Sequence, residues 1–435
     1  MNYTWVKKYI ALACAGVLGA SMLLAGCGEA KEEAASASVE EASSAAEEET
    51  PAEETEAVSE AETEAPADDA QAEEATTEDS EKLAQAPEIP GLTCESVMDL
   101  EYAESFDVYY YNDGYKVIDV KEDRPYLIVP EDGEEPDDLD DNMVVLQQPL
   151  DNIYMAASAV MALFDSMDGL DSIRMSGTQE NGWFVENAAK AMKDGKILFG
   201  GKYDKPDYEM LVAEGCSLAI ESTMILHSPK VQEMIEDLGI PVFTDYSSYE
   251  SEPLGRTEWI KAYGAMLNHE EQAQAFFNDQ MKIIEKLNDF QNTEKTVAYF
   301  HINTEGSAVV RTCTDYIPKM IEMAGGLYAF PDMKKSDDSR SASMTISMEQ
   351  FYSVAKDADY LVYNTSIDTS VNTMKDLLAK DELFKDFKAV KDGNVWSTGR
   401  SLYQATDTVG EFILDIHEML TSGDEGQMRF LTKIK

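Results

Sequence analysis

Short apolar runs that alternate with longer amphipathic segments are the feature that most restricts the fold of this chain. After residue 142 the runs MVVL, KILFGG, SLAIES and IPVFTDY alternate with segments of helical periodicity, of which NIYMAASAVMALFDSM is one. Runs of this length with helices between them are typical of parallel strands joined by crossover helices. We therefore expect an α/β lobe over residues 91–256.

The same alternation restarts after a long helical segment. Residues 257–291 carry apolar side chains at helical spacing along one stripe, and Asn268 is expected to interrupt the helix. Beyond this segment, TVAYFHIN, SAVVRTC and DYLVYN are predicted strands, and DYIPKMIEMAGG and VGEFILDIHEML are predicted helices. The expected architecture is two α/β lobes of similar plan, 91–256 and 292–435, joined by one long helix.

Residues 106–129 precede this pattern and have a different rhythm. The runs FDVYYYNDGYKVIDV and PYLIVP are short and alternating, and Asn112-Asp113-Gly114 is a turn signal. We expect an antiparallel β-hairpin here. The sequence leaves open whether the region 95–141 covers the edge of the N-terminal lobe's sheet or shapes a binding cleft.

The N-terminus has the pattern of an export signal that ends at a cysteine. Lys7 and Lys8 precede an apolar run over residues 10–24, which is shorter than the about 20 apolar residues of a membrane span. The following Leu-Ala-Gly-Cys resembles the lipobox of bacterial lipoproteins, in which the cysteine is acylated and becomes the new N-terminus. We expect residues 1–26 to be a signal peptide and Cys27 to carry the lipid anchor. The alternative is an ordinary signal peptide with a chance cysteine.

Residues 27–90 are expected to form a disordered acidic tether. From Gly28 to Pro90 the chain is rich in Ala, Glu, Ser and Thr and contains no aromatic residue, so it cannot bury enough apolar surface to offset its ordering entropy. The whole chain has 85 acidic and 34 basic residues and a net charge of −51. Such a charge repels phosphate backbones, so nucleic acid is not an expected partner.

The cysteines and histidines of the mature chain give no sign of a disulfide framework or a metal centre. Three widely spaced cysteines, Cys94, Cys216 and Cys313, are expected to pack in the interior. A site for bare Zn or Mn needs about three imidazoles with a carboxylate, which disfavours a receptor for a bare metal ion. The four histidines are His227, His269, His301 and His417. The motifs HExxH, GxSxG, P-loop and GxGxxG are absent from the mature chain.

Four segments resemble the substrate-binding proteins of ABC importers for ferric siderophores, haem and cobalamin. They are PDYEMLVAEGCSLAIES, PLGRTEWIKAYGAML, VVRTCTDYIPKMIEMAGG and ISMEQFYSVAKDADYLVYN, and the resemblance runs from about residue 142 to the C-terminus. It implies two Rossmann-like lobes connected by one long helix, a small-molecule ligand in the cleft, and limited hinge motion on binding. It also implies a monomer that delivers its ligand to an ABC permease with its ATPase.

The resemblance further implies that one surface glutamate on each lobe meets arginines of the permease. The family's glutamate lies in the first turn of a helix before a strand, which corresponds to Glu209 in DYEML and Glu349 in SMEQF. Two carboxylates far apart on a rigid body would orient docking through charge-assisted pairs. Without the resemblance, each glutamate would simply complement a helix dipole.

Ligand groups are sought beyond the carboxyl ends of strands, where open α/β sheets bind ligands. Arginine is favoured, because so acidic a chain would repel an anionic ferric chelate without local positive charge. Each arginine could instead pair with a neighbouring acid, and tyrosine or methionine could simply line the core. The expected ligand-binding residues are Gln148, Met224, Tyr246, Arg256, Arg311, Tyr316 and Arg400.

The sequence thus predicts a lipid-anchored extracytoplasmic receptor for an iron-siderophore or a related metal chelate, such as haem or cobalamin. We expect no enzymatic step, no resident cofactor and no metal bound directly by side chains. One alternative is a surface-tethered hydrolase or chelatase-like enzyme on the same two-lobe scaffold. Another is an extracellular sensor without a permease.

Overall fold

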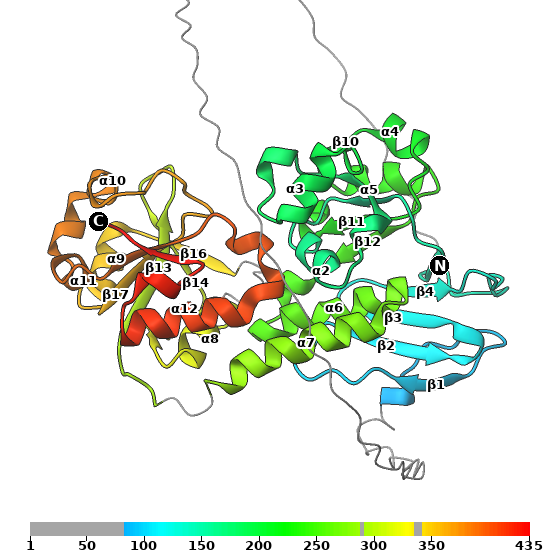
Figure 1. Ribbon diagram of the computed structural model, residues 1–435, viewed down its shortest axis with the longest axis horizontal. Helices are drawn as coiled ribbons and strands as arrows, with labels where there is room; N and C mark the ends of the chain where they lie inside the picture. Colours follow the sequence, from blue (N-terminus) through cyan, green and yellow to red (C-terminus); the bar gives the residue numbers. More distant parts are fainter. Residues whose placement is uncertain (1–81, 288–290, 335–341) are drawn as a thin grey trace, which may run out of the picture. The chain divides into compact units, whose positions relative to one another are not determined.

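The computed structural model describes residues 82–287, 291–334 and 342–435. The predicted signal peptide, Cys27 and most of the expected tether lie outside the described residues. Within these ranges the chain forms sheets of five, five and seven strands and one two-stranded ribbon, with helices around the second and third sheets (Figure 1). The predicted mixed α/β class is confirmed.

The first sheet is N-terminal and lies outside the α/β pattern. Its strands, in the order β1-β2-β3-β4-β5, are β1 (Cys94–Val97), β2 (Phe106–Tyr111), β3 (Lys116–Val120), β4 (Pro125–Val129) and β5 (Val144–Gln147). The predicted hairpin is confirmed, because β2 and β3 pair antiparallel across a turn in which Asp113 adopts φ 60°. The run MVVL was expected in the parallel sheet of the N-terminal lobe. This was wrong, because β5 pairs with β4 of the N-terminal sheet.

The end of the expected tether packs against this sheet. Ile89 is only 5% exposed and lies in a small core with Tyr109, Tyr111 and Leu127. The hydroxyl of Tyr111 donates to the carbonyl oxygen of Pro87 over 2.5 Å. The residues just before 90 therefore belong to the folded part, because the sheet's outer face is apolar and needs a cover.

The second sheet forms the N-lobe, residues 153–249. Its strands are all parallel in the order β12-β11-β6-β7-β8, namely β6 (Ile153–Met155), β7 (Ile173–Ser176), β8 (Leu198–Phe199), β11 (Ala219–Ser222) and β12 (Val242–Asp245). Around it lie α2 (Met161–Ser166), α3 (Glu186–Lys193), α4 (Tyr208–Ala213) and α5 (Pro229–Glu236), with a ribbon of β9 (Gly201–Lys202) and β10 (Lys205–Pro206). The prediction that NIYMAASAVMALFDSM is one helix was wrong. Its start is the central strand β6, since a strand buried on both faces lacks alternation and cannot be distinguished from helix by periodicity.

The segment between the lobes is two helices, α6 (Pro253–Leu267) and α7 (Glu270–Glu285). Asn268 adopts φ 58° and ends α6, so the predicted interruption is confirmed, but the expected single long helix is not. The two helices lie side by side beside β2 and β3 (Figure 1). Leu254 near the start of α6 shares a core with Ile284 near the end of α7, so α7 runs back along α6.

Helix α6 is buried on every side rather than along the expected stripe. All residues from 253 to 266 are buried, including Glu258 and Lys261, because the segment 99–103 and Phe277 of α7 cover the polar side chains that the sequence pattern would leave exposed. The Glu258 carboxylate accepts the backbone N–H groups of Glu101, Tyr102 and Ala103 within 2.9 Å. It also accepts from Lys261 Nζ over 2.7 Å. Each buried charge therefore has a partner.

The third sheet forms the C-lobe, residues 296–435. Its order is β16-β14-β13-β17-β18-β19, with β15 on β13, and the parallel pairs are β13 with β15, β13 with β17, and β17 with β18. The strands are β13 (Thr296–Ile302), β14 (Ala308–Arg311), β15 (Leu327–Tyr328), β16 (Ser343–Ile346), β17 (Tyr360–Tyr363), β18 (Val395–Thr398) and β19 (Leu431–Lys433). The helices are α8 (Tyr316–Met323), α9 (Met348–Ala355), α10 (Met374–Lys380), α11 (Lys388–Lys391) and α12 (Val409–Thr421). The strands and helices predicted from the C-terminal sequence runs are confirmed.

Short 3₁₀ helices occur in the connections. They are η1 (Asn112–Gly114), η2 (Leu170–Ser172), η3 (Glu180–Gly182), η4 (Thr223–His227), η5 (Ser247–Tyr249), η6 (Glu382–Asp386), η7 (Leu402–Gln404), η8 (Thr406–Thr408) and η9 (Glu425–Gln427). In the part of the chain that the structure describes, no helix combines the length and apolarity needed to cross a bilayer.

One buried carboxyl in the N-lobe has no partner. Glu221 on β11 is fully buried, and neither of its carboxyl oxygens has a hydrogen-bond partner among the described residues. Burial raises the pKa of this carboxyl to about 9. Glu221 is therefore protonated in the native protein near neutral pH, because ionisation in an apolar site is costly.

Loss of the Glu258 carboxylate should destabilise the whole fold. Glu258→Ala leaves three backbone N–H groups and the buried ammonium of Lys261 without their acceptor, so we expect the free energy of unfolding to fall by about 3–5 kcal/mol. Urea denaturation followed by circular dichroism measures the change. The control is Glu271→Ala, which removes an exposed carboxylate from the neighbouring α7 and should leave the midpoint unchanged. A Glu258→Ala midpoint equal to that of the control would contradict this account.

Glu221 should make stability fall as the pH rises. Its native pKa lies above that of the unfolded chain, so its contribution is complete below the ordinary glutamate pKa and is lost as the pH rises toward about 9. Between about pH 6.5 and 8.5 the free energy of unfolding should fall by about 1 kcal/mol per pH unit. Glu221→Gln should flatten this slope, whereas the exposed Glu233→Gln should keep it. Parallel curves for wild type and Glu221→Gln would show that Glu221 titrates normally.

Candidate functional site

The connections that follow the carboxyl ends of β7 and β18 meet at the junction of the two lobes. The backbone N–H of Phe184 donates to Oε1 of Gln404 over 2.8 Å, and Nε2 of Gln404 donates to the carbonyl oxygen of Gly182 over 2.8 Å. One C-lobe side chain thus pairs with the N-lobe backbone on both sides of Trp183. The carboxyl ends of strands in both lobes therefore face this junction, which is where α/β sheets usually bind ligands.

Two further hydrogen bonds hold the C-lobe segment next to Gln404, one from α6 and one from the N-lobe. The hydroxyl of Thr257 in α6 donates to the carbonyl oxygen of Thr406 over 2.8 Å, and the hydroxyl of Ser166 donates to the Asp407 carboxylate over 3.2 Å. Burial raises the pKa of Asp407 to about 6. Residues 402–408 therefore supply the C-lobe side of these hydrogen bonds to the N-lobe and to α6.

Arg311 is the centre of a polar cluster in the C-lobe. It ends β14, and its Nη2 donates to the hydroxyl of Tyr403 over 2.6 Å. Nδ2 of Asn364 donates to the same hydroxyl over 2.8 Å, and Asp315 lies 3.6 Å from Nη1 of Arg311. The hydroxyl of Tyr328 accepts from the Arg311 backbone N–H and donates to its carbonyl oxygen, which fixes the backbone there.

Arg256 and Tyr316 form a second contact between α6 and the C-lobe. The guanidinium carbon of Arg256, in the first turn of α6, lies 4.1 Å from the centre of the Tyr316 ring at the start of α8. Burial raises the pKa of Tyr316 to about 12, and the positive charges of Arg256 and Arg311 oppose this shift. The structure therefore brings three of the predicted ligand residues together: Arg256, Arg311 and Tyr316.

Three other predicted residues follow the carboxyl ends of strands, as expected. Tyr246 directly follows β12 and is buried, Met224 follows β11 and is 47% exposed, and Arg400 follows β18 and is exposed. The reason given for Gln148 was wrong, because β5 belongs to the N-terminal sheet. Its side chain donates to the carbonyl oxygen of Met266 over 2.9 Å and so packs against the end of α6.

The sequence analysis missed several residues of the junction. Asn364 directly follows the predicted strand DYLVY, and the rule used for the other candidates could have found it. Tyr403 and Gln404 lie in SLYQATDT, which has no periodicity that would place it. Tyr299 lies on β13, and its buried hydroxyl has no hydrogen-bond partner among the described residues.

Glu209 and Glu349 occupy equivalent positions in the two lobes. Each is exposed and is the second residue of a short helix, α4 or α9. Asp207 caps α4 by accepting the Met210 N–H over 3.0 Å, and Ser347 caps α9 by accepting the Gln350 N–H over 3.2 Å. The predicted position of each glutamate in the first turn of a helix is confirmed, whereas a docking role stays a prediction.

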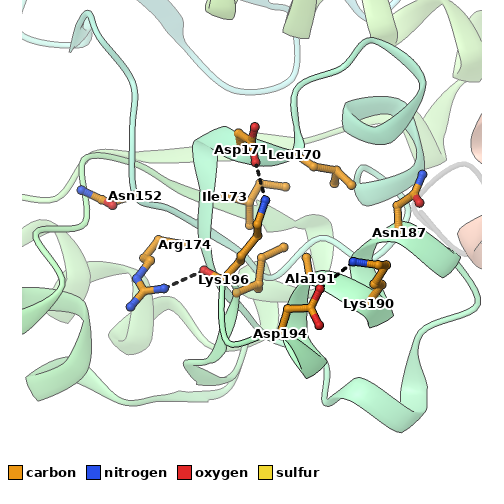
Figure 2. A pocket seen from close by; sticks show the side chains of 11 residues that line it. Asn152, Leu170, Asp171, Ile173, Arg174, Asn187, Lys190, Ala191, Asp194 and Lys196 are labelled. Atoms are coloured by element: carbon orange, nitrogen blue, oxygen red, sulfur yellow. Dashed lines mark hydrogen bonds and ion pairs between the residues drawn. The ribbon is translucent and has the colours of Figure 1, made fainter.

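A pocket of about 560 Å³ lies elsewhere, at the start of β7 beside α3 (Figure 2). Its basic side chains are each paired: Arg174 with Glu214, Lys190 with Asp194, and Lys196 with Asp171. None of the seven predicted ligand residues lines it. Over the described ranges, no three His, Cys, Asp or Glu side chains are grouped so that they could hold a metal ion.

Comparison with known proteins identifies the family. A family model described as periplasmic binding protein matches residues 181–402, more than half of the 435 residues. An uncharacterized lipoprotein of Methanocaldococcus jannaschii is 26% identical over 355 residues, which cover 74% of this chain and 81% of the relative. A second uncharacterized lipoprotein of that organism is 24% identical over 381 residues, covering 84% of this chain and 93% of the relative.

Solved structures with similar folds include a periplasmic heme binding protein of Vibrio cholerae, with 16% identity and a TM-score of 0.49. That match covers 60% of this chain and 96% of the other. An ABC-type Fe3+-hydroxamate transport protein from Saccharomonospora viridis has 15% identity and a TM-score of 0.47, covering 63% and 94%. The prediction of a binding protein rather than an enzyme is confirmed by the family match. This chain belongs to the periplasmic binding protein family, the substrate-binding proteins of ABC importers.

Proposed function

We propose that this chain is a lipid-anchored receptor that captures an iron-siderophore, or a related metal chelate such as haem or cobalamin, at the junction of its lobes. The observation that carries the proposal is the gathering of Arg256 and Arg311 around Tyr316 in a chain of net charge −51. Cations retained at one place in so acidic a protein support an anionic ligand there.

Apolar side chains at the same strand ends support a ligand with a large apolar surface. Phe184, Met224 and Tyr249 are 49%, 47% and 38% exposed, and they follow β7, β11 and β12 respectively. Exposed apolar groups that follow the carboxyl ends of parallel strands are typical of ligand sites. A metal chelate combines such an apolar body with acidic oxygens, so it matches both features.

The anchor and the delivery step complete the proposal. Acylation of Cys27 would hold the receptor at the outer face of the cytoplasmic membrane, and the names of the two archaeal relatives, both lipoproteins, support this. Glu209 and Glu349 would then meet basic residues of an ABC permease. Their equal positions at the starts of α4 and α9 support such a paired role.

Ligand titration tests the capture step. The mature protein is titrated with ferric siderophores, haemin and cobalamin while the emission of Trp183, Trp259 and Trp396 is followed. We expect saturable one-to-one quenching by one member, and a more than tenfold weaker affinity after Arg311→Gln. The control is Arg174→Gln, because Arg174 lies in the pocket of Figure 2. Flat titrations of a folded protein by every member would reject this ligand class.

Substitution of the paired glutamates tests the delivery step. Glu209→Lys and Glu349→Lys replace the expected docking charges, so uptake by vesicles that contain the permease and ATPase should be lost. The dissociation constant of the ligand should not change, because neither residue lies at the junction. Glu233→Lys and Glu322→Lys are matched controls on exposed helical positions of the N-lobe and the C-lobe. Normal uptake by the double variant Glu209→Lys/Glu349→Lys would end the docking hypothesis.

A further inference from the structure

Tyr403 uses its phenol oxygen as the acceptor for two strong donors. Arg311 donates to it over 2.6 Å and Asn364 over 2.8 Å. The donors are well buried, since Asn364 is 1% exposed and the Arg311 side chain 14%, whereas Tyr403 is only half-buried. A neutral phenol is a weak acceptor for a guanidinium, because a charged oxygen makes bonds about twice as strong.

A third donor beside this cluster is unused. Phe300 of β13 pairs with Val310 of β14, so Tyr299 and Arg311 are the next residues along the two strands. The hydroxyl of Tyr299 is buried and has no hydrogen-bond partner within the described part of the chain. A buried polar group without a partner is costly, so its retention indicates an acceptor that arrives from outside. One anionic oxygen could accept hydrogen bonds from Arg311, Asn364 and Tyr299 together.

The residue after Tyr403 joins the lobes. Gln404 makes its two hydrogen bonds to the N-lobe backbone at Gly182 and Phe184, and both residues belong to the single turn η7. Tyr403 and Gln404 are adjacent residues of this turn, so a shift of the Tyr403 backbone would be transmitted directly to Gln404. Displacement of the Tyr403 hydroxyl would therefore also strain the contacts of Gln404.

We infer that η7 is a gate that the ligand displaces: an anionic oxygen of the ligand, a carboxylate or catecholate, replaces the Tyr403 hydroxyl on Arg311 and Asn364, and the Gln404 contact between the lobes is released with it. This inference rests on the proposed function, and it adds the group of the ligand that Arg311 binds and the segment that moves. Tyr403 thereby acts as a competitor of the ligand and not as one of its contacts.

The first experiment measures affinity for haemin, which carries two carboxylates, and for ferric enterobactin, an anionic tricatecholate. Tyr403→Phe leaves both donors unoccupied in the empty protein, so both affinities should rise by about fivefold or more, since one hydrogen bond corresponds to about fivefold. Asn364→Asp places a negative charge beside Arg311 and should weaken both by about tenfold or more. The matched control is Tyr115→Phe, which removes a hydrogen-bonded hydroxyl in the N-terminal sheet and should change neither affinity.

The second experiment needs no ligand. Hydrogen–deuterium exchange at the Phe184 amide should accelerate in Gln404→Ala, because its acceptor is lost. It should also accelerate in Tyr403→Phe if η7 moves as a unit, because the acceptor of the Phe184 amide is the neighbouring Gln404. Unchanged exchange in Tyr403→Phe overturns the gate.

The outcomes separate this inference from the proposed function. If haemin or ferric enterobactin binds wild type and Tyr403→Phe weakens it, Tyr403 is a ligand contact and the inference is wrong while the proposed function stands. If neither probe binds any variant while another chelate binds wild type, the inferred anionic oxygen is wrong. If nothing in the wider panel binds, the proposed function fails and this inference with it.

Discussion

Two buried carboxylates, those of Glu250 and Glu258, attach the N-terminal sheet to the rest of the protein. Glu258 accepts the backbone N–H groups of residues 101–103, and Glu250 accepts those of Glu104 and Ser105 together with the indole N–H of Trp259. A segment without regular structure is thereby bound along α6 by hydrogen bonds to charged acceptors, which are the strong ones. Without these hydrogen bonds the two buried carboxylates would lack partners, which is costly. The burial of α6 therefore depends on the bonds between these carboxylates and residues 101–105.

Helix α6 also positions residues of the candidate site. The turn of α6 that contains Glu258 also contains Arg256 and Thr257, which contact Tyr316 and Thr406 of the C-lobe. Because these residues share one turn, the Glu258 bonds to the backbone of residues 101–103 also hold Arg256 in place. The C-lobe side of the junction, by contrast, is a connection between β18 and α12 with only two short 3₁₀ turns. If the inferred gate operates, the motion occurs in this connection and not in α6, which is buried on every side.

The sequence predicts most C-lobe elements because its strands and helices carry clear periodicity and glycine stops, as in TVAYFHIN and the helix before Gly325. It fails where burial removes the periodicity: β6 is buried on both faces, and α6 carries polar residues that the segment 99–103 and α7 cover. The arginines were proposed from charge alone, because a cation in so acidic a chain is a candidate for binding an anionic ligand, and their role stays a prediction. The surroundings of Gln148 could not be predicted, because the sequence does not show which of two sheets the run MVVL joins. Tyr403 and Gln404 could not be predicted for a similar reason, because the sequence of an aperiodic loop does not show which residues the loop contacts.

Asp315, the acidic residue beside Arg311, explains how this arginine stays available for a ligand in so acidic a protein. Oδ1 of Asp315 accepts the backbone N–H of Ile317 over 3.0 Å and caps α8, which leaves Oδ2 at 3.6 Å from the guanidinium. The carboxylate is close enough to keep the buried arginine charged, yet its engagement with the helix start prevents a short bidentate pair. The hydrogen-bonding edge of Arg311 is then occupied by a neutral phenol rather than by a carboxylate. An incoming anionic oxygen has to displace only that phenol, so the cap of α8 keeps this cation accessible within a surface of the opposite sign.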